Sequence, residues 1–125
     1  MIVGVGVDVD EIARLDRALT RTPRLARRLF TAGELEARRP GSLAARFAAK
    51  EAVAKVLGTG LGDVAWREIE ILANERGRPV LVLHGAAAAR AARLGLRHWS
   101  VSLTHLAGLA LALVVATAAG RETER

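Results

Sequence analysis

The first residues of the chain alternate between two kinds of side chain, with valine at every second position. A period of two with many β-branched residues predicts a β-strand over residues 2–9. Its valines share one face, and the opposite face carries Gly4, Gly6 and Asp8. Two glycines that lead to a carboxylate leave bare backbone beside it, as happens where a ligand or another chain comes close.

Helical spacing follows this strand. Asp10 is a candidate N-cap for a helix whose apolar stripe consists of Ile12, Leu15 and Leu19. Pro23 interrupts the pattern, and a further short helical piece is predicted to reach residue 30.

Capping residues mark the next two helices. Thr31 and Glu34 have the spacing of a capping box. Ser42 follows a Pro-Gly break and is the candidate N-cap of a helix over residues 43–57, which Gly58 ends. A glycine-rich loop is expected after that helix.

The second half of the chain is predicted to contain four strands and one alanine-rich helix. The strands are expected at residues 68–73, 80–83, 99–104 and 109–117, and the helix at residues 85–94. Together these elements predict one α+β domain over residues 1–120, followed by a polar tail at residues 121–125.

The helix over residues 43–57 is apolar around most of its circumference, which is typical of a buried helix. Its charges fall into two narrow strips, Arg46 with Lys50 and Glu51 with Lys55. A Glu and a Lys four residues apart also form an ordinary stabilising surface pair. On a mostly buried helix, however, charged groups need partners or a function.

Composition limits both the core and the chemistry. Aromatic residues make up only 3% of the chain, so the core is built mainly from Ala, Leu and Val, and so thin a core favours oligomerisation. The absence of cysteine excludes disulfides, thiolate nucleophiles and Cys-ligated metals. The longest apolar run, residues 106–120, is shorter than the roughly 20 residues that span a bilayer and is interpreted as a buried strand and its surroundings. No secretion signal opens the chain, so a cytoplasmic protein is expected.

Positive charge is concentrated rather than spread evenly. The net charge of +6 favours an acidic partner. Residues 12–30 hold a single aspartate against six arginines, namely Arg14, Arg17, Arg21, Arg24, Arg27 and Arg28. A solvated arginine-rich face and a docking surface for an acidic partner both fit this pattern. Lysine occurs only at Lys50 and Lys55, both within the helix over residues 43–57.

Asp8 and Glu51 form a candidate pair of metal ligands on separate elements. Without cysteine or a histidine pair at metal spacing, the expected ion is a hard one such as Mg²⁺. Magnesium in proteins typically binds one or two carboxylates together with phosphate and water oxygens. Lys55, one turn beyond Glu51, could then reach the same phosphates as a point charge. Periodicity alone leaves open whether the two carboxylates meet, and it leaves His105 open between a core histidine and a ligand.

Five segments, taken in order, resemble the holo-acyl-carrier-protein synthase family of 4′-phosphopantetheinyl transferases. They are Gly-Val-Gly-Val-Asp at residues 4–8, Phe-Thr-Ala-Gly-Glu-Leu at 30–35, the stretch from Arg46 to Gly60, Gly-Arg-Pro at 77–79 and Ser-Leu-Thr-His at 102–105. The resemblance implies a small, mostly antiparallel sheet packed against a long buried helix, and a homotrimer with sites at the subunit interfaces.

Residue roles follow from the same resemblance. It implies that Asp8 and Glu51 bind Mg²⁺ and that Lys55 and His105 contact the phosphates of coenzyme A. It also implies that Arg46 helps to hold the nucleotide end and that backbone near Gly58 lines the pocket. The acidic helix of an acyl carrier protein is expected to bind three arginines, Arg14, Arg21 and Arg24.

The implied reaction transfers 4′-phosphopantetheine from coenzyme A to a carrier-protein serine and releases adenosine 3′,5′-bisphosphate, with Asp8, Glu51 and Lys55 as the catalytic residues. The general base is open between Glu51 and a water held through it.

The main alternative, a basic nucleic-acid-binding module, is disfavoured by the scarcity of aromatic residues. A different magnesium-dependent enzyme is a third option. Neither nucleic acid nor a membrane is expected as a partner, and the identity of the carrier, the use of acylated coenzyme A and the role of Asp10 stay open.

Overall fold

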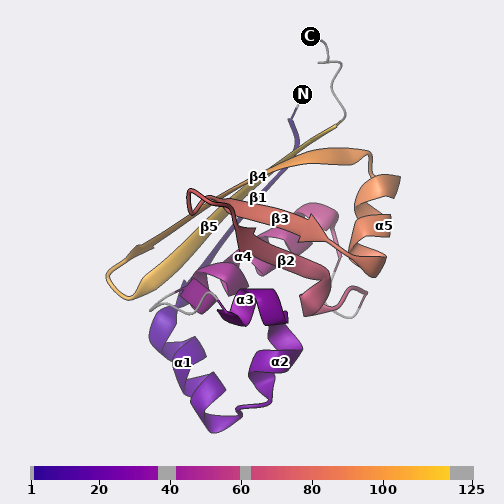
Figure 1. Ribbon diagram of the computed structural model, residues 1–125. Coiled ribbons are helices and arrows are strands. Elements are labelled where there is room, and N and C mark those ends of the chain that lie inside the picture. Colours follow the sequence, from indigo (N-terminus) through magenta and orange to yellow (C-terminus); the bar gives the residue numbers. More distant parts are fainter. Residues whose placement is uncertain (1, 37–41, 60–62, 119–125) are drawn as a thin grey trace.

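The computed structural model describes residues 2–36, 42–59 and 63–118, and Figure 1 shows their arrangement. The first half comprises β1 (Ile2–Glu11), α1 (Ile12–Arg21), α2 (Leu25–Leu29), α3 (Ala32–Glu36) and α4 (Ser42–Leu57). The second half comprises a 3₁₀ turn (Trp66–Glu68), β2 (Ile69–Ala73), β3 (Pro79–Leu83), α5 (Gly85–Arg93), β4 (Leu96–Leu106) and β5 (Leu109–Ala118). The expected polar tail and the domain limit at residue 120 lie outside the described residues.

The strands form two antiparallel sheets. One has the order β1-β5-β4, and the other is the β2–β3 hairpin. In Figure 1 the three long strands run side by side, the β2–β3 hairpin lies across them, and α1, α2 and α3 gather at one end. The α+β class and the antiparallel pairing are as predicted.

Helix α4 packs between the two sheets. Its small residues Ala48, Ala49 and Ala52 are fully buried and share one core cluster with residues of β2 and β5. On β5 the residues facing this cluster alternate strictly along the strand and are Ala112, Val114 and Ala116. Small side chains on both surfaces let the helix lie close to the sheet.

The prediction that Asp10 caps the first helix is wrong. Strand β1 continues through Glu11, which pairs with Leu109, and Glu11 is the N-cap residue without a side-chain cap hydrogen bond. The amide of Ile12 instead donates to the carbonyl of Gly108, in the turn of the β4–β5 hairpin, at 2.9 Å. The strand ladder therefore overrides the capping preference of Asp10.

Two other predicted caps are confirmed. The Thr31 amide donates to Glu34 Oε1 at 2.9 Å, and the Glu34 amide donates to Thr31 Oγ1 at 3.2 Å, as a capping box requires. Helix α4 ends at Leu57, followed by Gly58 with φ +68°, the left-handed conformation that favours glycine.

The face of β1 and β5 that points away from α4 is apolar and exposed. Val5, Val7 and Val9 are 58%, 53% and 48% exposed, and Leu109 and Leu113 on β5 are 38% and 45% exposed. We call these five residues the outer apolar face. The run at residues 106–120 was expected to be buried, but on its described strand residues only the face toward α4 is. No helix in the described ranges has the length and apolar character needed to cross a bilayer.

The contact between β1 and α4 depends on the absence of a side chain at Gly6. A Cβ atom built there would overlap the backbone carbonyl of Ala52. At Gly4 a Cβ would lie 2.6 Å from Cγ1 of Val56, which is the end of a side chain and has some freedom to move. The bare glycine face is present as predicted, but the neighbour that lies against Gly4 and Gly6 is α4 of the same chain rather than a ligand or another chain.

Replacing Gly6 with Ala is expected to lower the free energy of unfolding by about 3 kcal/mol, because rigid backbone must shift to admit the methyl group. Gly4→Ala should cost about 1 kcal/mol, since only a side chain must move. Gly33→Ala, in the short helix α3, is the matched control. Its Cβ would lie 3.1 Å from Cδ2 of Leu72, so only the end of a side chain must move. Urea unfolding of the three variants measures the order, and equal losses at positions 6 and 33 would contradict the account.

Candidate functional site

The carboxylates of the candidate site come from β1 and α4. Because side chains alternate along a strand, Asp8 and Asp10 follow Gly6 on the face of β1 that meets α4. Glu51 directly precedes Ala52, the residue whose carbonyl lies against Gly6. The contact that joins the two elements therefore also brings their acidic side chains together.

Asp8, Asp10 and Glu51 form one cluster. Each offers a carboxylate oxygen, and these oxygens all lie within 4.8 Å of one another. Asp8 Oδ2, Asp10 Oδ2 and Glu51 Oε1 are buried and accept no hydrogen bond within the described ranges. Buried polar atoms without partners are rare in folded proteins and indicate a site that needs a ligand.

The electrostatics of the cluster oppose three simultaneous negative charges. Burial, followed by hydrogen bonds with Asp10 and Asp8 and by their charges, raises the pKa of Glu51 to about 9. Burial also raises the pKa of Asp10, and the neighbouring Asp8 adds to this rise. A cation among these oxygens would reverse the effect, since it favours the ionised carboxylates.

Lys55 borders the cluster on its exposed side. Its ammonium donates to Asp8 Oδ1 at 3.0 Å and to the carbonyl of Val7 at 3.0 Å. The hydrogen bond with Asp8, together with the charge of that carboxylate, raises the pKa of Lys55. The side chain is 58% exposed, so a charged ammonium lies on the solvent side of the acidic cluster.

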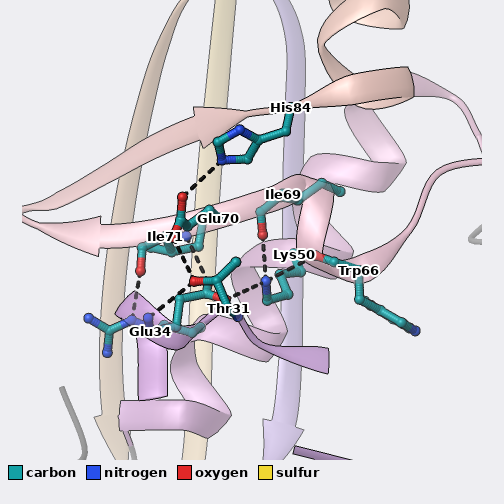
Figure 2. Close-up of polar contacts among 9 residues, drawn as sticks. Thr31, Glu34, Lys50, Trp66, Ile69, Glu70, Ile71 and His84 are labelled. Carbon is teal, nitrogen blue, oxygen red and sulfur yellow. Dashed lines mark hydrogen bonds and ion pairs between the residues drawn. The ribbon is translucent and has the colours of Figure 1, made fainter. Parts of the chain in front are cut away.

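The other charged strip of α4 is engaged inside the protein (Figure 2). Lys50 and Glu34 form an ion pair at 2.8 Å with both side chains fully buried. Lys50 also donates to the carbonyls of Trp66 at 3.0 Å and Ile69 at 2.5 Å, which uses all three of its donors. Burial lowers the pKa of Lys50, and the neighbouring Glu34 opposes that change.

Glu34 is equally well satisfied. Its Oε1 accepts from Lys50 and from the Thr31 amide, and its Oε2 accepts from the Ile71 amide at 2.8 Å. Removing one member of such a pair typically costs about 3–5 kcal/mol, because the other charge is left buried alone. The pair thus fixes the rotation of α4 about its axis, which keeps Glu51 on the side of β1.

Thr31 and Glu70 extend this network toward the surface. Thr31 Oγ1 donates to Glu70 Oε2 at 2.6 Å, and Glu70 Oε1 lies 2.9 Å from Nε2 of the exposed His84 (Figure 2). Burial acts to raise the pKa of Glu70, but the hydrogen bonds with Thr31 and His84 outweigh it and the pKa is lowered. The sequence assigned no role to Glu34 or Glu70 in holding α4. Lys50 was singled out by the rarity of lysine and as a charge on a mostly buried helix, but without a named partner.

Arg46 lies away from the carboxylate cluster. Its guanidinium is buried, with Nε donating to the carbonyl of Ile71 at 2.7 Å and Nη1 donating to Ser42 Oγ. In the protomer the side chain joins α4 to β2, and its expected contact with a nucleotide stays a prediction.

His105 lies on the same face of the sheet as the cluster. Asp10 and His105 both pair with Ala110, from the two sides of β5, so the three residues form one row. Two strand spacings separate the outer members, about 10 Å. His105 is exposed at this end of β4, although alternation groups it with Val101 and Leu103 as predicted.

Gly58 lies at the end of α4, beside α5. Arg90 Nε donates to the carbonyl of Leu57 at 3.0 Å, and a pocket here is lined by Gly58, Thr59, Arg90 and Arg93, with Asp63 also in its wall. This arrangement offers cationic side chains next to bare backbone, but the structure records no contact between Gly58 and the carboxylates.

The arginines expected to bind a partner are exposed. Arg14 and Arg21 lie on α1, and Arg24 immediately precedes α2. No ion pair within the described residues neutralises them. They therefore form a positively charged surface at the end of the molecule where α1 and α2 gather (Figure 1).

Comparison with known proteins adds to this geometry. A family model described as the 4′-phosphopantetheinyl transferase superfamily matches residues 4–114. A curated relative from Streptomyces griseus, named holo-[acyl-carrier-protein] synthase, is 54% identical over 121 residues, covering 93% of this chain and 98% of its own length.

Two solved structures share the fold. The holo-[acyl-carrier-protein] synthase of Neisseria meningitidis superposes with a TM-score of 0.84 at 35% identity, covering 94% of this chain and 99% of that one. The Helicobacter pylori enzyme of the same name, solved in complex with coenzyme A, gives a TM-score of 0.81 at 26% identity, covering 90% and 99%.

Replacing Glu51 with Gln is expected to stabilise the metal-free protein above pH 5. Folded Glu51 keeps its proton from its ordinary value of 4.5 up to about 9, whereas the unfolded chain releases it. The free energy of unfolding of the wild type therefore falls as pH rises through this window, and glutamine removes the effect. Glu51 is only half-buried, so we discount for solvent screening and expect about 1 kcal/mol at pH 8, or roughly 4 °C.

Thermal unfolding in chelator at pH 5, 7 and 9 measures this difference. Glu75→Gln, in the exposed turn between β2 and β3, is the matched control and should follow the wild type. A wild type and an E51Q variant that change in parallel with pH would show that Glu51 is not held protonated by its neighbours.

Proposed function

The chain belongs to the 4′-phosphopantetheinyl transferase superfamily, and on this premise we propose that it is a holo-acyl-carrier-protein synthase. It transfers 4′-phosphopantetheine from coenzyme A to a serine hydroxyl of an apo acyl carrier protein and releases adenosine 3′,5′-bisphosphate. The observation that carries the proposal is the cluster of Asp8, Asp10 and Glu51 beside Lys55, in a chain 54% identical to a protein of that name.

The cluster fits a divalent cation. Its donors are carboxylate oxygens, the ligands that Mg²⁺ prefers, and one oxygen of each residue is buried without a hydrogen-bond donor. We propose Asp8 and Glu51 as the residues that would hold this ion. Mg²⁺ held there would supply positive charge next to the oxygens on which negative charge develops.

Lys55 adds a second positive centre. Its hydrogen bonds to Asp8 and the Val7 carbonyl hold the ammonium beside the carboxylates, while more than half of the side chain faces solvent. From there it can contact phosphate oxygens, which orients the pyrophosphate and stabilises charge in the transition state. Asp8 therefore has two roles, as a ligand and as the group that positions Lys55.

The transfer forms one bond and breaks another at the β-phosphorus. The serine Oγ attacks phosphorus, the bond to the bridging oxygen breaks, and the bisphosphate leaves with that oxygen. The serine proton passes to a base, for which Glu51, directly or through a water, is the candidate. His105, Gly58 and Arg46 are proposed to hold the phosphates and the nucleotide.

Arg14, Arg21 and Arg24 are proposed as the docking surface for the carrier protein. Their exposure and lack of described ion pairs leave positive charge available for an acidic helix. Such a surface steers an acidic partner and acts mainly on association.

A homotrimer is also part of the proposal. The outer apolar face exposes contiguous side chains of β1 and β5, which is typical of a surface that another chain covers. In this assembly the sites lie at subunit interfaces and α4 is buried along its length. A cytoplasmic role in fatty-acid synthesis is the metabolic setting that we propose.

Mass spectrometry of the carrier protein measures the transfer directly. With apo acyl carrier protein, coenzyme A and Mg²⁺, the wild type is expected to add the mass of phosphopantetheine, and chelator should abolish the addition. Asp8→Ala and Glu51→Ala should each lose at least about 100-fold in kcat, since they remove charge stabilisation from the transition state.

A triple variant tests the docking surface. Replacing Arg14, Arg21 and Arg24 together with Glu should raise the KM for the carrier by roughly tenfold with little change in kcat.

Arg76→Glu is the matched control for the triple variant, because it lies in the exposed turn between β2 and β3. Wild-type protein that never changes the carrier mass would contradict the proposed function. Full activity of either alanine variant would refute the assignment of the metal ligands.

Sedimentation equilibrium tests the assembly. The wild type is expected at three times the mass of one chain, and Val7→Lys should sediment as a smaller species because a charge enters the outer apolar face. Val80→Lys, at the exposed residue of β3 and outside that face, should stay trimeric. A monomeric wild type at micromolar concentration would rule out the trimer.

A further inference from the structure

Asp10 is aimed at the same point as the two proposed ligands. It lies two residues after Asp8 on β1, so both side chains leave the same face of the strand, toward α4. A carboxylate oxygen of Asp10 lies within 4.8 Å of one on Asp8 and one on Glu51, and its Oδ2 is buried without a hydrogen-bond partner.

The described neighbours of Asp10 give it no structural role outside the cluster: its carboxyl group interacts with those of Glu51 and Asp8 and with the charge of Arg14. It does not cap α1, because Glu11 occupies the N-cap position. It also forms no described ion pair, since Lys55 bonds to Asp8 and the other described pairs lie elsewhere. Its buried Oδ2 nevertheless has no hydrogen-bond donor, which is rare for a buried polar atom in a folded protein.

The net charge of the cluster also favours a role for Asp10 in binding a cation. Lys55 is the one cation that the described ion pairs place against the cluster, and it stands against three carboxylates. Ionised, the three carboxylates and Lys55 carry a net charge of −2, which a divalent cation neutralises; Arg14 attracts Asp10 but forms no described ion pair with it. With Asp8 and Glu51 alone, the same lysine would leave only one negative charge for two positive ones.

We infer that Asp10 is a third protein ligand of the cation bound by Asp8 and Glu51, an inference that rests on the proposed function. A third carboxylate raises the charge of the ligand set, and affinity for a hard divalent ion rises with that charge. The chain therefore holds its cation before coenzyme A binds, rather than depending on pyrophosphate oxygens to complete the site.

Binding of Mn²⁺ to the protein without coenzyme A tests the inference, because Mn²⁺ prefers the same oxygen ligands as Mg²⁺. The free ion is counted by its electron paramagnetic resonance signal. We expect Asp10→Asn to weaken Mn²⁺ binding by about tenfold or more, and Asp8→Asn and Glu51→Gln to weaken it at least as much. The matched control is Glu11→Gln, the adjacent exposed side chain without a cap bond, which should bind Mn²⁺ as the wild type does.

A thermal melt of each variant in chelator shows whether it is folded, and Asp10→Asn should melt no lower than the wild type because it removes like-charge repulsion. Unchanged or tighter Mn²⁺ binding by folded Asp10→Asn, with weakened binding by the Asp8 and Glu51 variants, would overturn this inference alone. Failure of the wild type to bind Mn²⁺ would overturn it too, while the mass-spectrometric transfer assay would decide the proposed function separately.

Discussion

The approach of β1 to α4 at Gly6 is the constraint on which the site depends. With no side chain at that position, the backbone of the strand lies directly against the carbonyl of Ala52. The next residue on the same strand face is Asp8, and the residue before Ala52 is Glu51. Elements far apart in sequence thus bring their carboxylates together through backbone packing, which is more rigid than a contact between long side chains.

The two charged strips of α4 differ in how their polar groups are satisfied. Toward β2, Lys50 and Glu34 are fully buried, and every donor of the lysine has an acceptor. Toward β1, the oxygens of Asp8, Asp10 and Glu51 are crowded together, and one on each residue has no donor. The first strip stabilises the position of the helix, and the second keeps binding capacity for a ligand. A folded chain tolerates such unsatisfied groups where function requires them.

Sequence periodicity predicted most of the fold for identifiable reasons. Valines at every second position marked β1, and a helix apolar around its circumference marked α4. The capping box at Thr31 and Glu34 and the glycine after Leu57 placed two helix boundaries. Asp10 was misjudged because a local preference for capping was weighed without the pairing of β1 to β5, which extends one residue beyond it.

The candidate site was predictable only in part. Asp8 and Glu51 could be chosen by residue type, but their meeting depends on tertiary packing that no local pattern encodes. The partnership of Lys50 with Glu34 was missed for the same reason, since the two residues lie on different helices. The spacing of Asp8 and Asp10 was a readable signal, because residues two apart on a strand share a face.

Anomalous diffraction from crystals grown with Mn²⁺ would test the central claim most directly. We expect one strong anomalous peak within bonding distance of carboxylate oxygens of both Asp8 and Glu51. A peak elsewhere, or crystals with saturating Mn²⁺ and no peak between β1 and α4, would contradict it.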